Sequence, residues 1–312
     1  MIPPFSTLQG RLRMQHLRLL IAVEERGSLR QAADVLALTQ PAVTKMLRDM
    51  ETLLGVTLFE RHVRGLRPTR FGAAATRYAK LVFSDMAGLR DELAALESGK
   101  VGKVRVGAVM APTPVLLAEV IRRLKRDHPL LDVSVQVDTS DVLVPMLERD
   151  QVDVVLGRVP EGWDNSLLEF EHLSDEGLAI VVGHDHPLLK RRKLSLEELA
   201  VFPWILQPRP SPMRTLVDLS FADAGLAPPP SAIETAAVLM TTSLLPGSDL
   251  IAVLPSSVAA YYARLDVLKV LPVRLPRELG PYGIVTRRGR ALSASMSLLF
   301  DTLRAAAAEG LA

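Results

Sequence analysis

The stretch 37-ALTQPAVTKMLRDME-51 decides the fold at the N-terminal end of this chain. Thr39 is a residue type that caps helix N-termini, and Pro41 would then lie in the first turn, where proline has no interior hydrogen bond to lose. Apolar residues then recur at intervals of three and four, which predicts one buried helical face. These residues are Val43, Met46, Leu47, Met50, Leu53 and Leu54.

The opposite face of this predicted helix carries groups that suit the edges of DNA bases. Gln40, Thr44 and Arg48 share it at intervals of four, with Lys45 beside them. Gln pairs with adenine, Lys and Arg pair with guanine, and the Thr methyl contacts thymine. An ordinary amphipathic helix could present the same side chains to water, so the flanking segments must decide between the two interpretations.

A second helix precedes this one, and a hairpin follows it. The segment 28-SLRQ-31 has the pattern of a capping box. Two helices in this order form a helix–turn–helix, whose second helix enters the DNA major groove. In 58-LFERHVRGLRPT-69, two β-prone runs flank Arg64-Gly65, which predicts a wing that contacts phosphates or the minor groove. The predicted DNA-contacting residues are Ser28, Thr39, Gln40, Pro41, Thr44, Lys45, Arg48, Arg61, Arg64 and Arg67.

The run 27-GSLRQAADVLALTQPAVTKMLRDMETLLGVTLFERHVRGLRPTRFG-72 resembles the DNA-binding domain of LysR-type transcriptional regulators, with the same element order and no gap. Thr44-Lys45 stands where many members have Ser-Arg, which is similar to the subgroup that contains regulators of protocatechuate and sugar-acid genes. The resemblance implies a bacterial transcription regulator with three kinds of partner: double-stranded DNA, RNA polymerase and a small-molecule effector.

Composition and charge agree with a folded, DNA-binding protein. The chain has 312 residues, 48% hydrophobic and 23% charged, which is enough for two or three domains. Residues 1–71 hold eleven Lys/Arg against six Asp/Glu, while the whole chain has a net charge of only +2. A basic head suggests a polyanion partner, although charge alone fits a solvated surface equally well. The N-terminus lacks an apolar signal core and Thr235–Ala263 is broken by prolines, so we expect a cytoplasmic protein without a membrane partner.

The segment 72–98 predicts a linker helix that pairs two chains. It contains no proline, and its apolar residues alternate at spacings of three and four, the a/d pattern of a coiled coil. A helix packed on its own protein would show a similar pattern. The resemblance implies a homodimer that assembles into a homotetramer. The predicted dimerisation residues are Ala79, Val82, Met86, Leu89, Leu93 and Leu96.

The body of the chain alternates strands with helices, which predicts an α/β fold with mainly parallel pairing. The chain crosses to a second lobe near Ser174 and returns near Leu275, as in a periplasmic-binding-protein-like clamp. Lobe I would hold about 101–173 and 276–312, and lobe II about 174–275. The complete prediction is an all-α winged helix-turn-helix domain over 14–71, the linker helix over 72–98, and an α/β two-lobed effector domain over 101–312.

A clamp of this kind binds a small ligand between its lobes. In 138-DTSDV-142, a hydroxyl can cap the next helix, whose backbone N–H groups then face an anion. Two arginines in 207-QPRPSPMR-214 suggest a carboxylate ligand, although surface arginines in a proline-rich loop would look the same. By resemblance these loops line the inducer pocket. The predicted effector-binding residues are Thr113, Thr139, Ser140, Arg209, Ser211, Arg214 and Thr235.

Other classes of protein leave weaker signals. The chain has no cysteine, which excludes disulfides, thiolate metal sites and thiol redox chemistry. We find no GxSxG, GxGxxG, P-loop or HExxH pattern, so we predict no catalytic residues and no cofactor. His184 and His186 flank Asp185, but two histidines before a proline are more typical of a strand end than of a metal site. A ligand-binding clamp or an α/β enzyme with an appended DNA-binding head remains the alternative.

Overall fold

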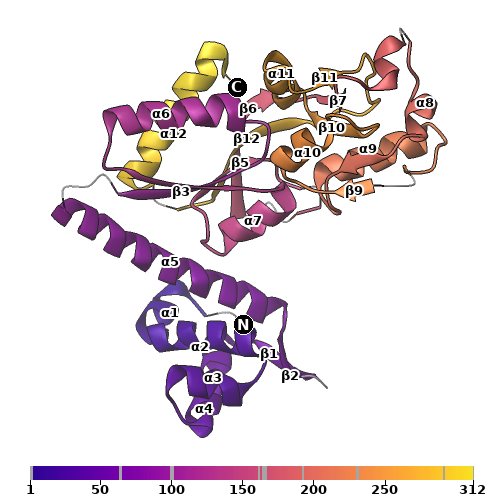
Figure 1. Ribbon diagram of the computed structural model, residues 1–312. Helices are drawn as coiled ribbons and strands as arrows, with labels where there is room; N and C mark the ends of the chain where they lie inside the picture. Colours follow the sequence, from indigo (N-terminus) through magenta and orange to yellow (C-terminus); the bar gives the residue numbers. More distant parts are fainter. Residues whose placement is uncertain are drawn as a thin grey trace. The chain divides into compact units, whose positions relative to one another are not determined.

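The computed structural model describes residues 3–62, 65–98, 102–160, 162–163, 167–191, 193–229, 232–290 and 292–311. The chain forms two compact units, Met1–Arg90 and Asp91–Ala312, and each is described by itself. Figure 1 shows the helical N-terminal unit and the larger unit built on two sheets.

The first unit is a winged helix–turn–helix. Helices α2 (Met14–Arg26), α3 (Leu29–Leu36) and α4 (Gln40–Leu54) pack together, and β1 (Phe59–His62) pairs antiparallel with β2 (Gly65–Pro68). Helix α5 (Arg70–Ser98) begins in this unit and runs beyond it. Helix α1 (Phe5–Arg11) was not predicted from the sequence, because none of its side chains is buried and its apolar residues therefore show no helical period. The core of the unit includes Leu19, Val23, Ala32, Val43 and Met50, all essentially inaccessible.

Lobe I of the second unit contains a five-stranded sheet in the order β4-β3-β5-β12-β6. Its strands are β3 (Lys103–Ala108), β4 (Asp132–Val137), β5 (Val154–Gly157), β6 (Leu168–Asp175) and β12 (Pro281–Arg287). Its helices are α6 (Ala118–Asp127), extended at its start by a π-helical turn (Thr113–Leu117), α7 (Ser140–Glu148), and α12 (Ala294–Ala306), extended at its end by another (Ala307–Leu311).

Lobe II contains a second five-stranded sheet in the order β11-β7-β10-β8-β9. Its strands are β7 (Leu178–Val182), β8 (Trp204–Leu206), β9 (Ala232–Glu234), β10 (Ile251–Pro255) and β11 (Lys269–Val270). Its helices are the 3-10 turn Pro187–Lys190, α8 (Leu196–Ala200), α9 (Pro212–Asp223), α10 (Val238–Leu244) and α11 (Ser256–Arg264).

The prediction of mainly parallel pairing is wrong. Strand β3 pairs parallel with β4 and β5, and β8 pairs parallel with β9 and β10, but β12 and β7 each pair antiparallel with both of their neighbours. The parallel pairs come from local strand–helix–strand units. The antiparallel strands β6, β7 and β12 flank the two crossings between the lobes. Strand β6 was not predicted from the sequence, because most of its side chains are exposed and polar and it therefore lacks an apolar pattern.

The two lobes have separate apolar cores, and these locate the point at which the chain returns to lobe I. Leu275 and Leu279 pack in the core of lobe II, whereas Tyr282 and Ile284 pack in the core of lobe I. Gly280 lies between them with φ = 69°, a conformation that glycine adopts without strain. The return crossing therefore passes through the residues just before β12.

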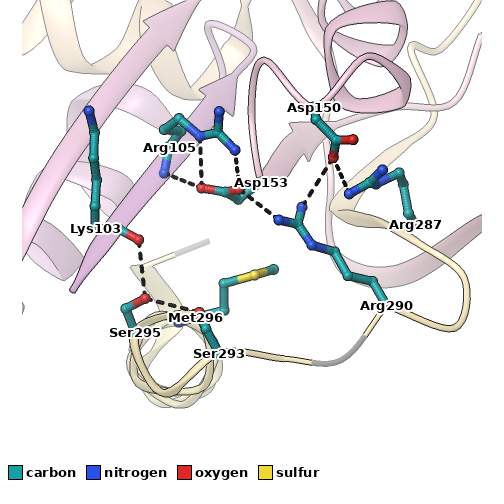
Figure 2. A network of polar contacts seen from close by, with 9 residues as sticks. All are labelled: Lys103, Arg105, Asp150, Asp153, Arg287, Arg290, Ser293, Ser295 and Met296. Atoms are coloured by element: carbon teal, nitrogen blue, oxygen red, sulfur yellow. Dashed lines mark hydrogen bonds and ion pairs between the residues drawn. The ribbon is translucent and has the colours of Figure 1, made fainter. Parts of the chain in front are cut away.

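A partly buried polar network closes the end of lobe I at which β5 begins. Figure 2 shows Asp153 between Arg105 of β3 and Arg290 of the loop before α12. The Asp153 carboxylate accepts hydrogen bonds from Arg105 Nη2 at 2.7 Å and from Arg290 Nη2 at 3.1 Å. Asp150 forms an ion pair with Arg287 at the end of β12. The network therefore holds the first residues of β5 in place, and the last residue of that strand leads into the pocket described below.

Candidate nucleic-acid interface and effector pocket

Helix α4 presents the predicted base-reading face to solvent. Gln40, Lys45 and Arg48 are exposed, while Val43 and Met50 on the other side of the helix are completely buried. Thr39 caps the helix, its hydroxyl accepting a bond from Ala42 N at 3.4 Å, as the sequence predicted. Pro41 lies in the first turn and is exposed as well. The apolar side of α4 therefore packs into the core of the unit, and its polar side is exposed to solvent, where DNA could contact it.

Two contacts shape this face. Gln40 Nε2 donates a hydrogen bond to Thr44 Oγ1 at 2.9 Å, so the side-chain amide of Gln40 has a defined orientation along the helix. Neither Lys45 nor Arg48 has an ion-pair partner among the described residues, so both charges are available to an external anion. Ser28 caps α3 and accepts from Gln31 N at 3.2 Å, and this one bond is the part of the predicted capping box that the structure contains.

The wing is fixed to the helices at its base. Leu66 N donates to the carbonyl oxygen of Gly27 at 2.7 Å, and a Cβ on Gly65 would lie 2.5 Å from that same oxygen. Glu51 near the end of α4 accepts bonds from Leu58 N and Phe59 N, at 2.7 and 3.3 Å. The predicted wing arginines Arg61 and Arg67 are exposed, whereas Arg64 lies outside the described residues.

The linker helix α5 divides the predicted dimerisation residues into two groups. Ala79 is buried in the core of the first unit and Val82 packs against that core. Met86, Leu89 and Leu93 are instead about half exposed along the same helix, with no cover from the described residues. The side chain of Leu96 lies outside the described residues. The apolar residues of α5 therefore belong to the domain core at Ala79 and Val82 and form an open stripe, Met86, Leu89 and Leu93, further along the helix.

The second unit contains a narrow pocket at the carboxyl ends of strands from both lobes. Residues after β3, β4 and β5 contribute Val109, Met110, Ala111, Asp138, Thr139, Ser140 and Arg158, and lobe II with the return crossing contributes Gln207, Pro212, Met213, Pro255 and Leu279. The carboxyl ends of parallel strands are where α/β folds bind ligands. The cavity volume is about 30 Å³, which holds about two water molecules.

Two predicted effector-binding residues, Thr139 and Ser140, line this pocket at the N-terminus of α7. Ser140 Oγ accepts a hydrogen bond from Arg158 N at 3.2 Å. Thr139 is the N-cap residue, but its hydroxyl makes no capping bond to the helix. Asp138 accepts a bond from Thr139 N at 2.8 Å, the only hydrogen bond that its carboxylate receives from the described residues. The segment 138–140, which leads into α7, therefore contributes one carboxylate and two hydroxyls to the lining of the pocket.

Arg158 was missed by sequence reasoning and is the cation of this pocket. Its guanidinium donates to two backbone carbonyls of the return crossing, Leu279 O and Gly280 O, at 3.2 Å each. No carboxylate among the described residues lies within ion-pair distance of it. Burial lowers the pKa of Arg158 to about 10, against a smaller opposing effect of Glu176, so the group stays charged at neutral pH. Its position two residues after the buried strand that was expected at 152–156 is the signal that could have found it.

The other predicted effector-binding residues have protein partners and do not line this pocket. Arg214 is buried and forms ion pairs with Asp218 at 3.0 Å and with Glu234 at 2.8 Å. Arg209 is exposed and pairs with the same Asp218 at 2.8 Å. Ser211 caps α9, Thr113 Oγ1 donates to Val109 O, and Thr235 Oγ1 accepts from Ala237 N. The carboxylates beside Arg209 and Arg214 offset the charge that suggested an anionic ligand there.

The histidines that raised the question of a metal have structural partners. His186 is buried, its ring packs at a tilt against Phe202 with the ring centres 5.0 Å apart, and its Nδ1 accepts a hydrogen bond from Leu188 N at 3.2 Å, while burial lowers the pKa of the ring. His184 lies 3.7 Å from Asp266. The described residues contain no cluster of three or more metal-ligating side chains, and none of their helices is long and apolar enough to cross a membrane.

A winged helix–turn–helix that exposes the predicted base-reading face, followed by a two-lobed α/β domain with a pocket between the lobes, defines a ligand-responsive DNA-binding regulator. Comparison with known proteins agrees. Residues 14–73 match the family described as bacterial regulatory helix-turn-helix protein, lysR family, and residues 97–308 match the LysR substrate binding domain. The chain therefore belongs to the LysR family of transcriptional regulators, as its sequence predicted.

Similar proteins cover the chain almost completely. It is 36% identical over 300 residues to the transcriptional regulator GbpR of Azospirillum brasilense, covering 96% of this chain and 88% of that protein. It is 29% identical to the regulator PcaQ of Agrobacterium fabrum, with 96% of each chain covered. Among solved structures, full-length BenM matches with a TM-score of 0.53 at 26% identity, covering 96% of this chain and 99% of that one. These relatives are regulators, so no enzymatic role is indicated.

Proposed function

We propose that this chain is a cytoplasmic regulator that reads an interrupted dyad through α4 and the wing, and that a small carboxylate bound between the lobes controls it. It would belong to the subgroup that includes regulators of protocatechuate and sugar-acid genes. The observation that carries the proposal is the pocket at the strand ends, which contains a charged guanidinium and the N-terminus of α7. Both favour an anion.

The proposed working parts are the winged domain 14–71, the linker helix 72–98 and the effector domain 101–312. The open stripe on α5 supports pairing of two linker helices, because Met86, Leu89 and Leu93 expose apolar surface at heptad spacing. Two such dimers would form the tetramer that presents four DNA-binding heads to the operator and to RNA polymerase. A ligand changes the output only if it binds two arrangements of this assembly with different affinities.

The test is footprinting of the full-length protein on genomic DNA, with and without a panel of aromatic and sugar acids and their neutral counterparts that lack the carboxylate. We expect a protected dyad whose extent changes with at least one acid. Protection without any sequence preference would contradict base reading by α4. A footprint that no compound in the panel alters, charged or neutral, would contradict control by a ligand between the lobes.

A further inference from the structure

Arg158 stands at the junction of three parts of the effector domain. It directly follows β5 of lobe I, it lines the pocket, and its guanidinium binds the carbonyl groups of Leu279 and Gly280. Leu279 packs in the core of lobe II, whereas Tyr282, two residues after Gly280, packs in the core of lobe I. The side chain of Arg158 therefore lines the pocket and also contacts the return crossing at residues 279–280, about which the lobes would move.

Among the described residues, no carboxylate pairs with the charge of Arg158, whose guanidinium lies 5.8 Å from the centre of the Tyr282 ring. Carbonyl oxygens are neutral acceptors, and the nearest influential acid, Glu176, instead accepts hydrogen bonds from Ser257 N and Oγ at 3.1 and 2.6 Å. A half-buried guanidinium without a carboxylate is poorly compensated, and a carboxylate in the pocket would supply both the charge and a bidentate geometry. Arg209 and Arg214 differ in this respect, because each already has an ion pair.

Asp138 defines the second half of the site. It lines the same pocket and directly precedes Thr139, the N-cap residue of α7, but its negative charge would repel an anion placed against it. A carboxylate oxygen that faces a ligand accepts hydrogen bonds, so it suits a hydroxyl group. One pocket with a cation at one position and a hydrogen-bond acceptor at another favours a ligand that carries both a carboxylate and a hydroxyl.

We propose that the effector is a hydroxylated carboxylic acid whose carboxylate binds Arg158 and whose hydroxyl binds Asp138, and that Arg158 exchanges its bonds with Leu279 and Gly280 for this carboxylate. The inference rests on the proposed control by a ligand between the lobes. Its mechanical consequence follows from the small size of the cavity, which holds about two water molecules and admits such an acid only when the lobes separate. Release of the crossing carbonyls from Arg158 is the step that permits this movement.

The direct test uses matched ligands on the full-length protein. We would measure binding of gluconate, hexanoate and glucitol, and of 3,4-dihydroxybenzoate, benzoate and catechol, by calorimetry, within a wider panel of hydroxylated acids that includes lactate, malate and 4-hydroxybenzoate. The acid with both groups should bind, loss of the carboxylate should weaken binding at least about tenfold, and loss of the hydroxyls about threefold or more. Absence of binding by every hydroxylated acid overturns the inference.

Variants test whether Arg158 binds the carboxylate and Asp138 binds the hydroxyl. Arg158→Gln should weaken binding of the hydroxylated acid at least about tenfold. Arg158→Lys should weaken it less, because lysine keeps the positive charge but lacks the two-pronged hydrogen-bonding geometry of the guanidinium. Asp138→Asn should reduce the preference for hydroxylated over unhydroxylated acid. Arg122→Gln, on an exposed face of α6, is the control and should bind like the wild type. If either Arg158 variant that folds normally binds the acid as tightly as the wild type and Arg122→Gln do, Arg158 does not bind the carboxylate.

Hydrogen exchange tests the coupling to the crossing, and the DNA footprint separates this inference from the proposed function. Ligand binding should change amide exchange in residues 276–282, and Arg158→Gln should produce a similar change without ligand. Unchanged exchange in both cases overturns the coupling. If glucitol or catechol alters the footprint while the acids do not, control by a ligand stands and the acid site is overturned. If no compound alters it, the proposed function itself fails.

Discussion

Asp153→Asn is the substitution for which the structure gives the clearest energetic expectation. The carboxylate is 6% exposed and accepts hydrogen bonds from Arg105 N at 2.8 Å, Arg105 Nη2 at 2.7 Å and Arg290 Nη2 at 3.1 Å. Removal of one partner from a buried ion pair costs about 3–5 kcal/mol. The side chain of Arg105 is 36% exposed, so water screens part of this interaction. We therefore expect a loss of about 2–3 kcal/mol in the stability of lobe I.

The assay uses the two tryptophans of the chain, one in each lobe. Trp163 packs against the core of lobe I and Trp204 is buried in lobe II, so a Trp204→Phe background leaves an emission signal from lobe I alone. In thermal unfolding, Asp153→Asn should lower Tm by about 5–10 °C for a unit of this size. Asp132→Asn, at an exposed position in the same sheet, is the matched control. Equal Tm values for the two variants would show that the network contributes nothing to stability.

The pH dependence of Tm in the wild type and in Asp153→Asn tests the same network. Burial acts to raise the pKa of Asp153, but hydrogen bonds from the side chain and backbone of Arg105 outweigh it, and the folded-state pKa lies below the ordinary value. A depressed carboxyl pKa stabilises the fold above the unfolded-state value and loses this effect as pH falls through the folded-state value. The Tm difference between wild type and Asp153→Asn should thus be constant above about pH 5 and shrink below about pH 4. A difference that grows on acidification would contradict this sign.

Three further predictions concern the DNA-binding unit and the linker helix. Gln40→Ala or Lys45→Ala should lose about 1–3 kcal/mol of discrimination at particular base pairs, measured by affinity for operator variants; uniform weakening on unrelated DNA would contradict base reading. Glu in place of Leu89 or Leu93 should shift sedimentation toward smaller species, because a charge would enter the open stripe; an unchanged assembly would contradict pairing through α5. Glu51→Gln should weaken the bonds to the start of the wing and lower Tm of this unit by about 2–5 °C, and an unaltered Tm would show that these bonds are dispensable.

Local patterns predicted the winged domain except for α1, which buries none of its side chains. Its helices, caps and hairpin depend on residues close in sequence, such as Thr39 with Ala42 and Ser28 with Gln31, and each is present in the structure. Local patterns also predicted most of the strands and helices of the body, but not β6, whose side chains are mostly exposed and polar. Sheet direction was not readable, because antiparallel pairing of β12 with β5 and β6 joins residues more than a hundred positions apart.

The sequence by itself determined the family, the helix–turn–helix with its exposed polar face and the presence of a two-lobed domain, since periodicity and capping act over a few residues. Only the tertiary structure decided which arginine belongs to the pocket. Arg214 and Arg158 are the same residue type, but Asp218 and Glu234 neutralise Arg214, whereas among the described residues Arg158 meets the carbonyls of Leu279 and Gly280 and the ring of Tyr282, and no carboxylate. The difference lies in partners that the fold brings from distant segments, and charge compensation between distant residues has no signature along the chain.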